Sequence, residues 1–195
     1  MSLAALVTSF ALVALAELGD KTQIAVITLS SRFRVLSVFV GAMLAFLVTT
    51  GVAVAIGDAL TLVLPTFWIR VAAAILFLVF GVYTIASVIL KRDEAEFKAK
   101  KETRNGVYSS FSLVLLMELG DKTQLSVIAL TAEYEFPLFV FAGVMLAFAL
   151  ITALGATVGM ALTKFVPLKY IQLASGVVFL LLGVVFLVTS VLGVA

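Results

Sequence analysis

Apolar residues follow one another along this chain in six long runs separated by short polar breaks. Each run is close to the ~20 residues that a helix needs to cross a bilayer, and none alternates apolar and polar positions as a barrel strand does. In lipid, only helices and closed barrels satisfy every backbone polar group. The pattern therefore predicts an all-α integral membrane protein with six transmembrane helices. They are expected at Leu3–Leu29, Leu36–Leu60, Trp68–Leu90, Val107–Thr131, Pro137–Leu162 and Lys169–Leu192.

The two halves of the chain repeat each other. The heptapeptide ELGDKTQ at Glu17–Gln23 recurs at Glu118–Gln124, and GAMLAF at Gly41–Phe46 recurs as GVMLAF at Gly143–Phe148. Three helices per half is an odd number, so the second half is expected upside down relative to the first. Inverted repeats around a site at the membrane midplane are a transporter architecture. The small residues of GAMLAF and GVMLAF predict close helix packing.

This repeat divides the chain into a first three-helix repeat (1–90), a charged loop (91–106) and a second, inverted three-helix repeat (107–195). Hydrophobic residues make up 64% of the chain and charged residues only 12%, whereas a soluble domain carries about 25% charged residues. The absence of cysteine and histidine excludes disulfides and thiolate or imidazole metal ligands. The N-terminal stretch lacks a basic segment and a cleavage signal, so we expect it to be retained as the first helix.

The basic residues between the runs predict the orientation, because cytoplasmic loops carry an excess of Lys and Arg. On one side of the membrane, Arg70 is the only basic residue, and it is accompanied by Glu133 and Glu135. We interpret this acidic pair as part of an ordinary loop; a cation-attracting vestibule is the alternative. Both termini are therefore expected outside, and Lys91–Asn105 in the cytoplasm. The loops after the first, third and fifth runs carry ten basic residues: Arg32, Arg34, Lys91, Arg92, Lys98, Lys100, Lys101, Arg104, Lys164 and Lys169.

The two heptapeptides place charged residues inside the first and fourth runs, where each charge costs at least ~2.5–3.5 kcal/mol and marks a functional site by default. In a continuous helix, Glu, Asp and Lys at this spacing share one face, and the glutamate can pair with the lysine of its own helix. Gly19 and Gly120 allow either the close approach of a neighbouring backbone or a break in the helix, and the sequence leaves this choice open. Thr22 would point away from the carboxylates on an unbroken helix.

Counting charges suggests a ligand for this site. Four carboxylates and two lysines sum to −2, which one divalent cation or two protons would neutralise, so an antiport cycle is a hypothesis. Hard oxygen ligands favour Ca²⁺, Mn²⁺ or Mg²⁺ over Zn²⁺ or Cu⁺. The predicted metal ligands are Glu17, Asp20, Glu118 and Asp121. Residues predicted to tune, orient or complete the site are Gly19, Lys21, Thr22, Gln23, Gly120, Lys122, Thr123 and Gln124.

The doubled heptapeptide resembles the E-x-G-D-[KR]-[ST] hallmark of the transmembrane-protein-165-type cation/proton antiporters. That family includes Golgi and chloroplast manganese/calcium transporters and bacterial manganese exporters. Both copies are complete in this chain, and the resemblance covers nearly all of it. It implies that the acidic residues of the motif bind the cation, with Mn²⁺ favoured and Ca²⁺ as the alternative. It also implies export across a bacterial plasma (inner) membrane in exchange for protons.

Three other functions compete with this interpretation. An exporter of amino acids or other small organic solutes would need aromatic or amide groups aimed at them, whereas the motif offers mainly carboxylates. An enzyme is not expected, because we find no nucleophile–base pair. A passive channel stays open. We expect no cofactor and no nucleic-acid partner; the cation, protons and the lipid bilayer are the expected partners, and a homo-oligomer is left open.

Overall fold

The structure, a computed structural model, describes residues 2–90, 105–165 and 168–192, and its regular elements are all α-helices. The expected all-α class is therefore confirmed. The cytoplasmic loop predicted at 91–106 lies almost wholly outside the described residues, and so do six of the ten basic residues that predict the orientation. The helices are α1 (Ser2–Glu17), α2 (Lys21–Ser30), α3 (Val35–Val63), α4 (Thr66–Ile89), α5 (Gly106–Glu118), α6 (Lys122–Tyr134), α7 (Pro137–Phe165) and α8 (Leu168–Leu192).

Within the described residues, the stretches long and apolar enough to cross a membrane lie in α3, α4, α7 and α8. Helices α1 and α2 meet the same test only as a pair, bent by 69° at the break between them. Helix α5 has 13 residues, which is too short to cross a bilayer alone. Length and composition therefore support four spans, or five if the bent pair is one span.

The first and fourth predicted helices are each divided in the structure. Leu3–Leu29 was expected as one helix, but α1 ends at Glu17 and α2 begins at Lys21. Val107–Thr131 is divided in the same way, because α5 ends at Glu118 and α6 begins at Lys122. Each half of the chain thus contains two short helices followed by two long ones. Both breaks fall inside the heptapeptide.

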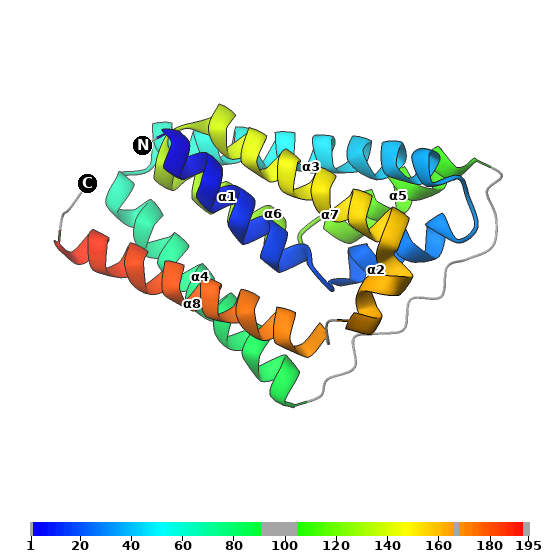
Figure 1. Ribbon diagram of the computed structural model, residues 1–195. Helices are drawn as coiled ribbons and strands as arrows, with labels where there is room; N and C mark the ends of the chain where they lie inside the picture. The colour runs from blue at the N-terminus through cyan, green and yellow to red at the C-terminus, as the bar shows by residue number, and fades with distance from the viewer. Residues whose placement is uncertain (1, 91–104, 166–167, 193–195) are drawn as a thin grey trace.

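The helices pack in a pattern that follows the repeat. Helix α3 packs against α5 and α6, and its counterpart α7 packs against α1 and α2. Helices α3 and α7 also pack on each other, while α4 and α8 form a separate pair. Figure 1 shows this pair along one side of the molecule, with α1 and α6 between it and the α3 and α7 helices. Helices α1 and α6 therefore lie between the two pairs of long helices.

Two glycines allow the closest of these helix contacts. A Cβ at Gly41 of α3 would collide with the Val107 carbonyl on α5, and one at Gly143 of α7 would collide with the Leu6 carbonyl on α1. Glycine is required because the backbones approach too closely for any side chain. The predicted packing role of GAMLAF and GVMLAF is thus confirmed at their first residues.

We predict that Gly41→Ala lowers the stability of the detergent-solubilised protein by about 1–3 kcal/mol, as overpacking does elsewhere. Gly51→Ala is the matched control, because it lies in the same helix and a Cβ there meets nothing within 4 Å. Alanine favours the helix over glycine by up to about 1 kcal/mol, so Gly51→Ala should leave stability unchanged or raise it. Thermal unfolding of both variants measures the difference, and equal melting temperatures would contradict this packing.

Candidate metal centre

Each heptapeptide forms a helix break with the same backbone geometry. Gly19 has φ +79° and Gly120 has φ +78°, a left-handed conformation that costs residues with a Cβ roughly 1–2 kcal/mol. The aspartate that follows each glycine is extended and stands at the N-cap of the next helix: Asp20 has φ −79° and ψ 168°, and Asp121 has φ −74° and ψ 164°. The glycine of the motif therefore ends one helix and allows the next to begin.

The glutamine that closes each heptapeptide stabilises the break. Gln23 is the third residue of α2, and its Oε1 accepts the backbone N–H of Gly19. Gln124 does the same for the N–H of Gly120 at 2.8 Å. This contact resembles a capping box, in which the third residue of a helix satisfies a free donor at its start. The glutamine oxygens are therefore engaged with the backbone, which supports an orienting role.

The threonines connect the two breaks to each other. Thr22 donates to Oε1 of Glu118 at 2.7 Å, and Thr123 donates to Oε1 of Glu17 at 2.5 Å. Each bond joins opposite halves of the chain, and all four side chains are buried. The break turns Thr22 toward the acidic residues, whereas an unbroken helix would have turned it away.

The lysines also cross between the halves. Lys21 Nζ lies 2.7 Å from Oδ1 of Asp121, and Lys122 Nζ lies 2.8 Å from Oδ2 of Asp20. The expected pairing of each lysine with the glutamate of its own helix is wrong. The glutamate ends one helix and the lysine begins the next, so the one-face geometry of a continuous helix is lost. Both ion pairs therefore hold one repeat against the other.

Three of the four predicted ligands come together. One carboxylate oxygen each from Glu17, Glu118 and Asp121 lies within 4.8 Å of the other two. Glu17 is 2% exposed and Glu118 is 1% exposed. The Oδ2 atom of Asp121 is buried and has no hydrogen-bond partner among the described residues. Buried, converging carboxylate oxygens with a free acceptor suit a hard divalent cation. Asp20 lies outside this group and is held by Lys122.

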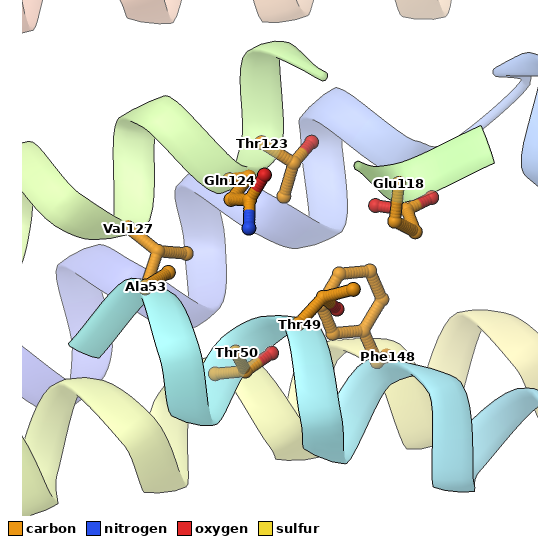
Figure 2. Close-up of a pocket in the computed structure, with 8 residues that line it drawn as sticks. All are labelled: Thr49, Thr50, Ala53, Glu118, Thr123, Gln124, Val127 and Phe148. Carbon is orange, nitrogen blue, oxygen red and sulfur yellow. The ribbon is translucent and has the colours of Figure 1, made fainter. Parts of the chain in front are cut away.

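Two small polar cavities flank the carboxylate cluster and are related by the repeat. Figure 2 shows the first, where Glu118, Thr123 and Gln124 face Thr49 and Thr50 of α3 across a space of about 10 Å³. The second also measures about 10 Å³, and its polar lining comes from Glu17, Thr22, Gln23 and Thr152. A cavity of this size holds about one water-sized particle. Each glutamate thus has its own small chamber.

A pair of stacked aromatic rings borders the chambers. Phe46 of α3 and Phe148 of α7 stack with their centroids 3.7 Å apart and their planes 16° from parallel. Both are 2% exposed. Phe148 lines both cavities, and Phe46 lines the one beside Glu17. Phe148, stacked on Phe46 where α3 and α7 pack together, is therefore an apolar side chain that both chambers share.

Sequence reasoning missed these rings and the threonines beside them. A signal was present, because Phe46 matches Phe148 and Thr50 matches Thr152 at the offset of 102 residues that also relates Gly41 to Gly143. Their apolar surroundings favoured an interpretation as packing alone. Only the crossing of α3 and α7 shows that they border the acidic cluster.

A membrane-embedded helical bundle with facing, buried acidic helix breaks defines a cation transporter of the broken-helix type. A sequence profile for "Divalent cation/proton antiporter GDT1" matches residues 5–91 and 106–193, one match in each half. The chain belongs to this family of divalent cation/proton antiporters. It is a transporter, not an enzyme.

Named relatives agree with this membership. The chain is 30% identical to "Protein PAM71, chloroplastic" of Arabidopsis thaliana over 91% of its own length and 55% of that protein. It is 29% identical to a Vibrio cholerae protein named "Putative manganese exporter", over 91% of this chain and 88% of the relative. "GDT1-like protein 5" of Oryza sativa subsp. japonica is 28% identical over 90% of each chain. No solved structure matches the chain.

We predict that Gly120→Ala weakens the break without a steric clash, because a Cβ there meets nothing within 4 Å. The loss should be the roughly 1–2 kcal/mol of left-handed backbone strain. Divalent-cation transport should fall with it as the acidic groups lose their alignment. Thermal unfolding and vesicle flux measure the two effects, again with Gly51→Ala as control. Wild-type values for both would show that the left-handed backbone is dispensable.

Proposed function

We propose that this chain exports a divalent cation, with Mn²⁺ as the favoured substrate and Ca²⁺ as the alternative, in exchange for protons. The observation that carries the proposal is the convergence of Glu17, Glu118 and Asp121, whose oxygens lie within 4.8 Å of one another. These carboxylates bind the cation. Asp20 joins them when Lys122, which holds its carboxylate aside, moves away.

The lysines compete with the cation for the aspartates. Lys21 is 43% exposed and Lys122 is 22% exposed, while their aspartate partners are 11% and 6% exposed. The lysine ends therefore have room to move and the carboxylates do not. Because four carboxylates and two lysines sum to −2, one divalent cation or two protons complete the charge balance. The same buried charge thus couples cation release to proton uptake.

The size and chemistry of the site support a bare or nearly bare ion over an organic solute. Each chamber of about 10 Å³ holds one water-sized particle, and an amino acid has several times more heavy atoms. The polar groups that line the chambers are carboxylates, hydroxyls and amides, which suit hard cations. The printed name of the Vibrio cholerae relative favours manganese among them.

We further propose six spans with both termini outside, in a bacterial plasma (inner) membrane. Helices α5 and α6 then form a broken span as α1 and α2 do, which the shared backbone geometry of the two heptapeptides supports. Helices α1 and α6 occupy the outer half of the membrane and α2 and α5 the inner half. The acidic cluster lies between them, near the midplane, where alternating access requires it.

We predict that Asp121→Asn lowers Mn²⁺ flux into or out of proteoliposomes at least about tenfold, since each 1.4 kcal/mol of lost stabilisation is a factor of ten. Asp58→Asn is the matched control, because Asp58 is exposed on α3 and lines neither chamber. Flux of Mn²⁺, Ca²⁺ and an amino acid should be compared for both variants at equal amounts of inserted protein. Normal cation flux in Asp121→Asn would remove the carboxylate cluster from transport.

Exchange for protons predicts that an opposing pH gradient drives cation movement. Mn²⁺ should accumulate in vesicles against its own gradient when protons flow the other way, and a protonophore should abolish that accumulation. A channel would give downhill flux that is insensitive to the pH gradient. Internal Mn²⁺ and internal pH, followed together, decide between exchange and passive flow.

A further inference from the structure

The packing of the bundle is less symmetric than its sequence. Helix α4 packs against α6, and α8 packs against α1. By the repeat, α8 should pack equally against α2 and α4 against α5, but the described residues show no comparable contact for either pair. In Figure 1, the α4 and α8 pair runs close to α1 and α6 near the N-terminus and diverges from α2 and α5 at the other end.

In the proposed orientation, this asymmetry describes one state of an alternating-access cycle. Helices α1 and α6 then occupy the outer half of the membrane, so the α4 and α8 pair is closed against the outer half and splayed from the inner half. The contacts that join α4 and α8 to α1 and α6 must break when the protein opens outward.

An ion pair joins α4 to the end of α6. Arg70 Nε donates to Oε2 of Glu133 at 3.1 Å, and the side chains are 18% and 11% exposed. Glu133 thus lies in the last turn of α6 and has a partner, so the expectation of an ordinary loop there was wrong. A buried charge left without its partner is costly, so the pair forms or separates as a unit.

The end of α6 also contacts the other two helices through Tyr134. Tyr134, next to Glu133, donates from its hydroxyl to Oγ1 of Thr8 on α1 at 3.1 Å. The Tyr134 ring meets Phe186 of α8 edge to face, with centroids 6.5 Å apart. One site at the end of α6 therefore joins α1, α4, α6 and α8.

The repeat offers no equivalent ion pair on the inner side. At the offsets of 101 and 102 residues, Glu133 corresponds to Arg32 and Arg70 corresponds to Gln172. An arginine and a glutamine have no opposite charges to pair. The ion pair that stabilises closure of the outer half is thus not repeated at the equivalent positions of the inner half.

We propose that Arg70 and Glu133 are gating residues of the transport cycle. Their ion pair holds α4 against α6, closes the route from the acidic cluster to the outer face, and biases the protein toward the state open to the cytoplasm. Outward opening separates the pair, and cation release follows. This proposal rests on the orientation and alternating access proposed above, and it adds the residues that control the outer gate.

The chain has no cysteine, so one introduced thiol can report on the gate. Ala129 of α6 lies one turn from Glu133 toward the acidic cluster and is 8% exposed. With Ala73 and Leu76 of α4, it lines an apolar cavity of about 190 Å³. In Ala129→Cys, a membrane-impermeant maleimide added from outside should react slowly. Adding Glu133→Gln or Arg70→Gln should raise that rate several-fold, because the outer half opens more often.

The matched control is Glu135→Gln, which makes the same change two residues away at an exposed position. It should leave labelling and transport unchanged. The charge-swapped variant Arg70→Glu with Glu133→Arg should restore slow labelling and wild-type flux, which a general loss of folding would not allow. Unchanged labelling in Glu133→Gln, or a rise that appears only from the cytoplasmic face, would overturn the outer gate.

Failure of the gate and failure of the proposed function give different results. If Asp121→Asn abolishes flux while Glu133→Gln alters neither labelling nor flux, only the gate is overturned. If Glu133→Gln raises labelling from outside while Asp121→Asn transports normally, the outer gate is supported and the proposed cation site is overturned. Both measurements use the full chain in vesicles at matched protein amounts.

Discussion

The placement of acidic side chains from both repeats within one largely buried region is the constraint on which the rest of this structure depends. A single charge at membrane depth costs at least ~2.5–3.5 kcal/mol, and like charges placed together add to that cost. Cationic and hydroxyl groups from the opposite repeat lower this cost. Lys21 reaches Asp121, Lys122 reaches Asp20, and each threonine donates to the glutamate across from it. Neither repeat can satisfy its own acidic groups, so the two halves must fold against each other.

The helix breaks make those crossed contacts geometrically feasible. On a continuous helix the lysine would lie beside the glutamate of its own segment. Because Gly19 and Gly120 turn the backbone, each lysine and threonine begins a new helix and points to the other repeat. The N-termini of α2 and α6 also carry partial positive charge from the helix dipole, which favours anionic groups such as the N-cap aspartates. The break thus serves both the stability of the cluster and its exposure to an ion.

The residues that the two repeats share and the residues in which they differ have separate roles in the proposed transport cycle. Equivalent residues of the two repeats, such as Glu17 and Glu118, meet in one acidic cluster, and a small chamber lies beside each of these glutamates. Among the positions that differ between the repeats are Arg70 and Glu133, which correspond to Gln172 and Arg32. In the transport cycle proposed above, a shared site with unequal gates gives the protein a preferred resting state.

By itself the sequence determined the helical class, the repeat and the residues of the acidic site, because apolar length, internal duplication and charge at membrane depth are local or countable properties. It also indicated that the motif glycines allow a break. It did not decide whether the break forms, which partner each lysine takes, or that Phe46, Phe148 and Thr50 border the site. Those depend on how distant segments meet. An ion pair such as Lys21 with Asp121 joins residues 100 positions apart, and only the packing of one repeat on the other brings them within reach.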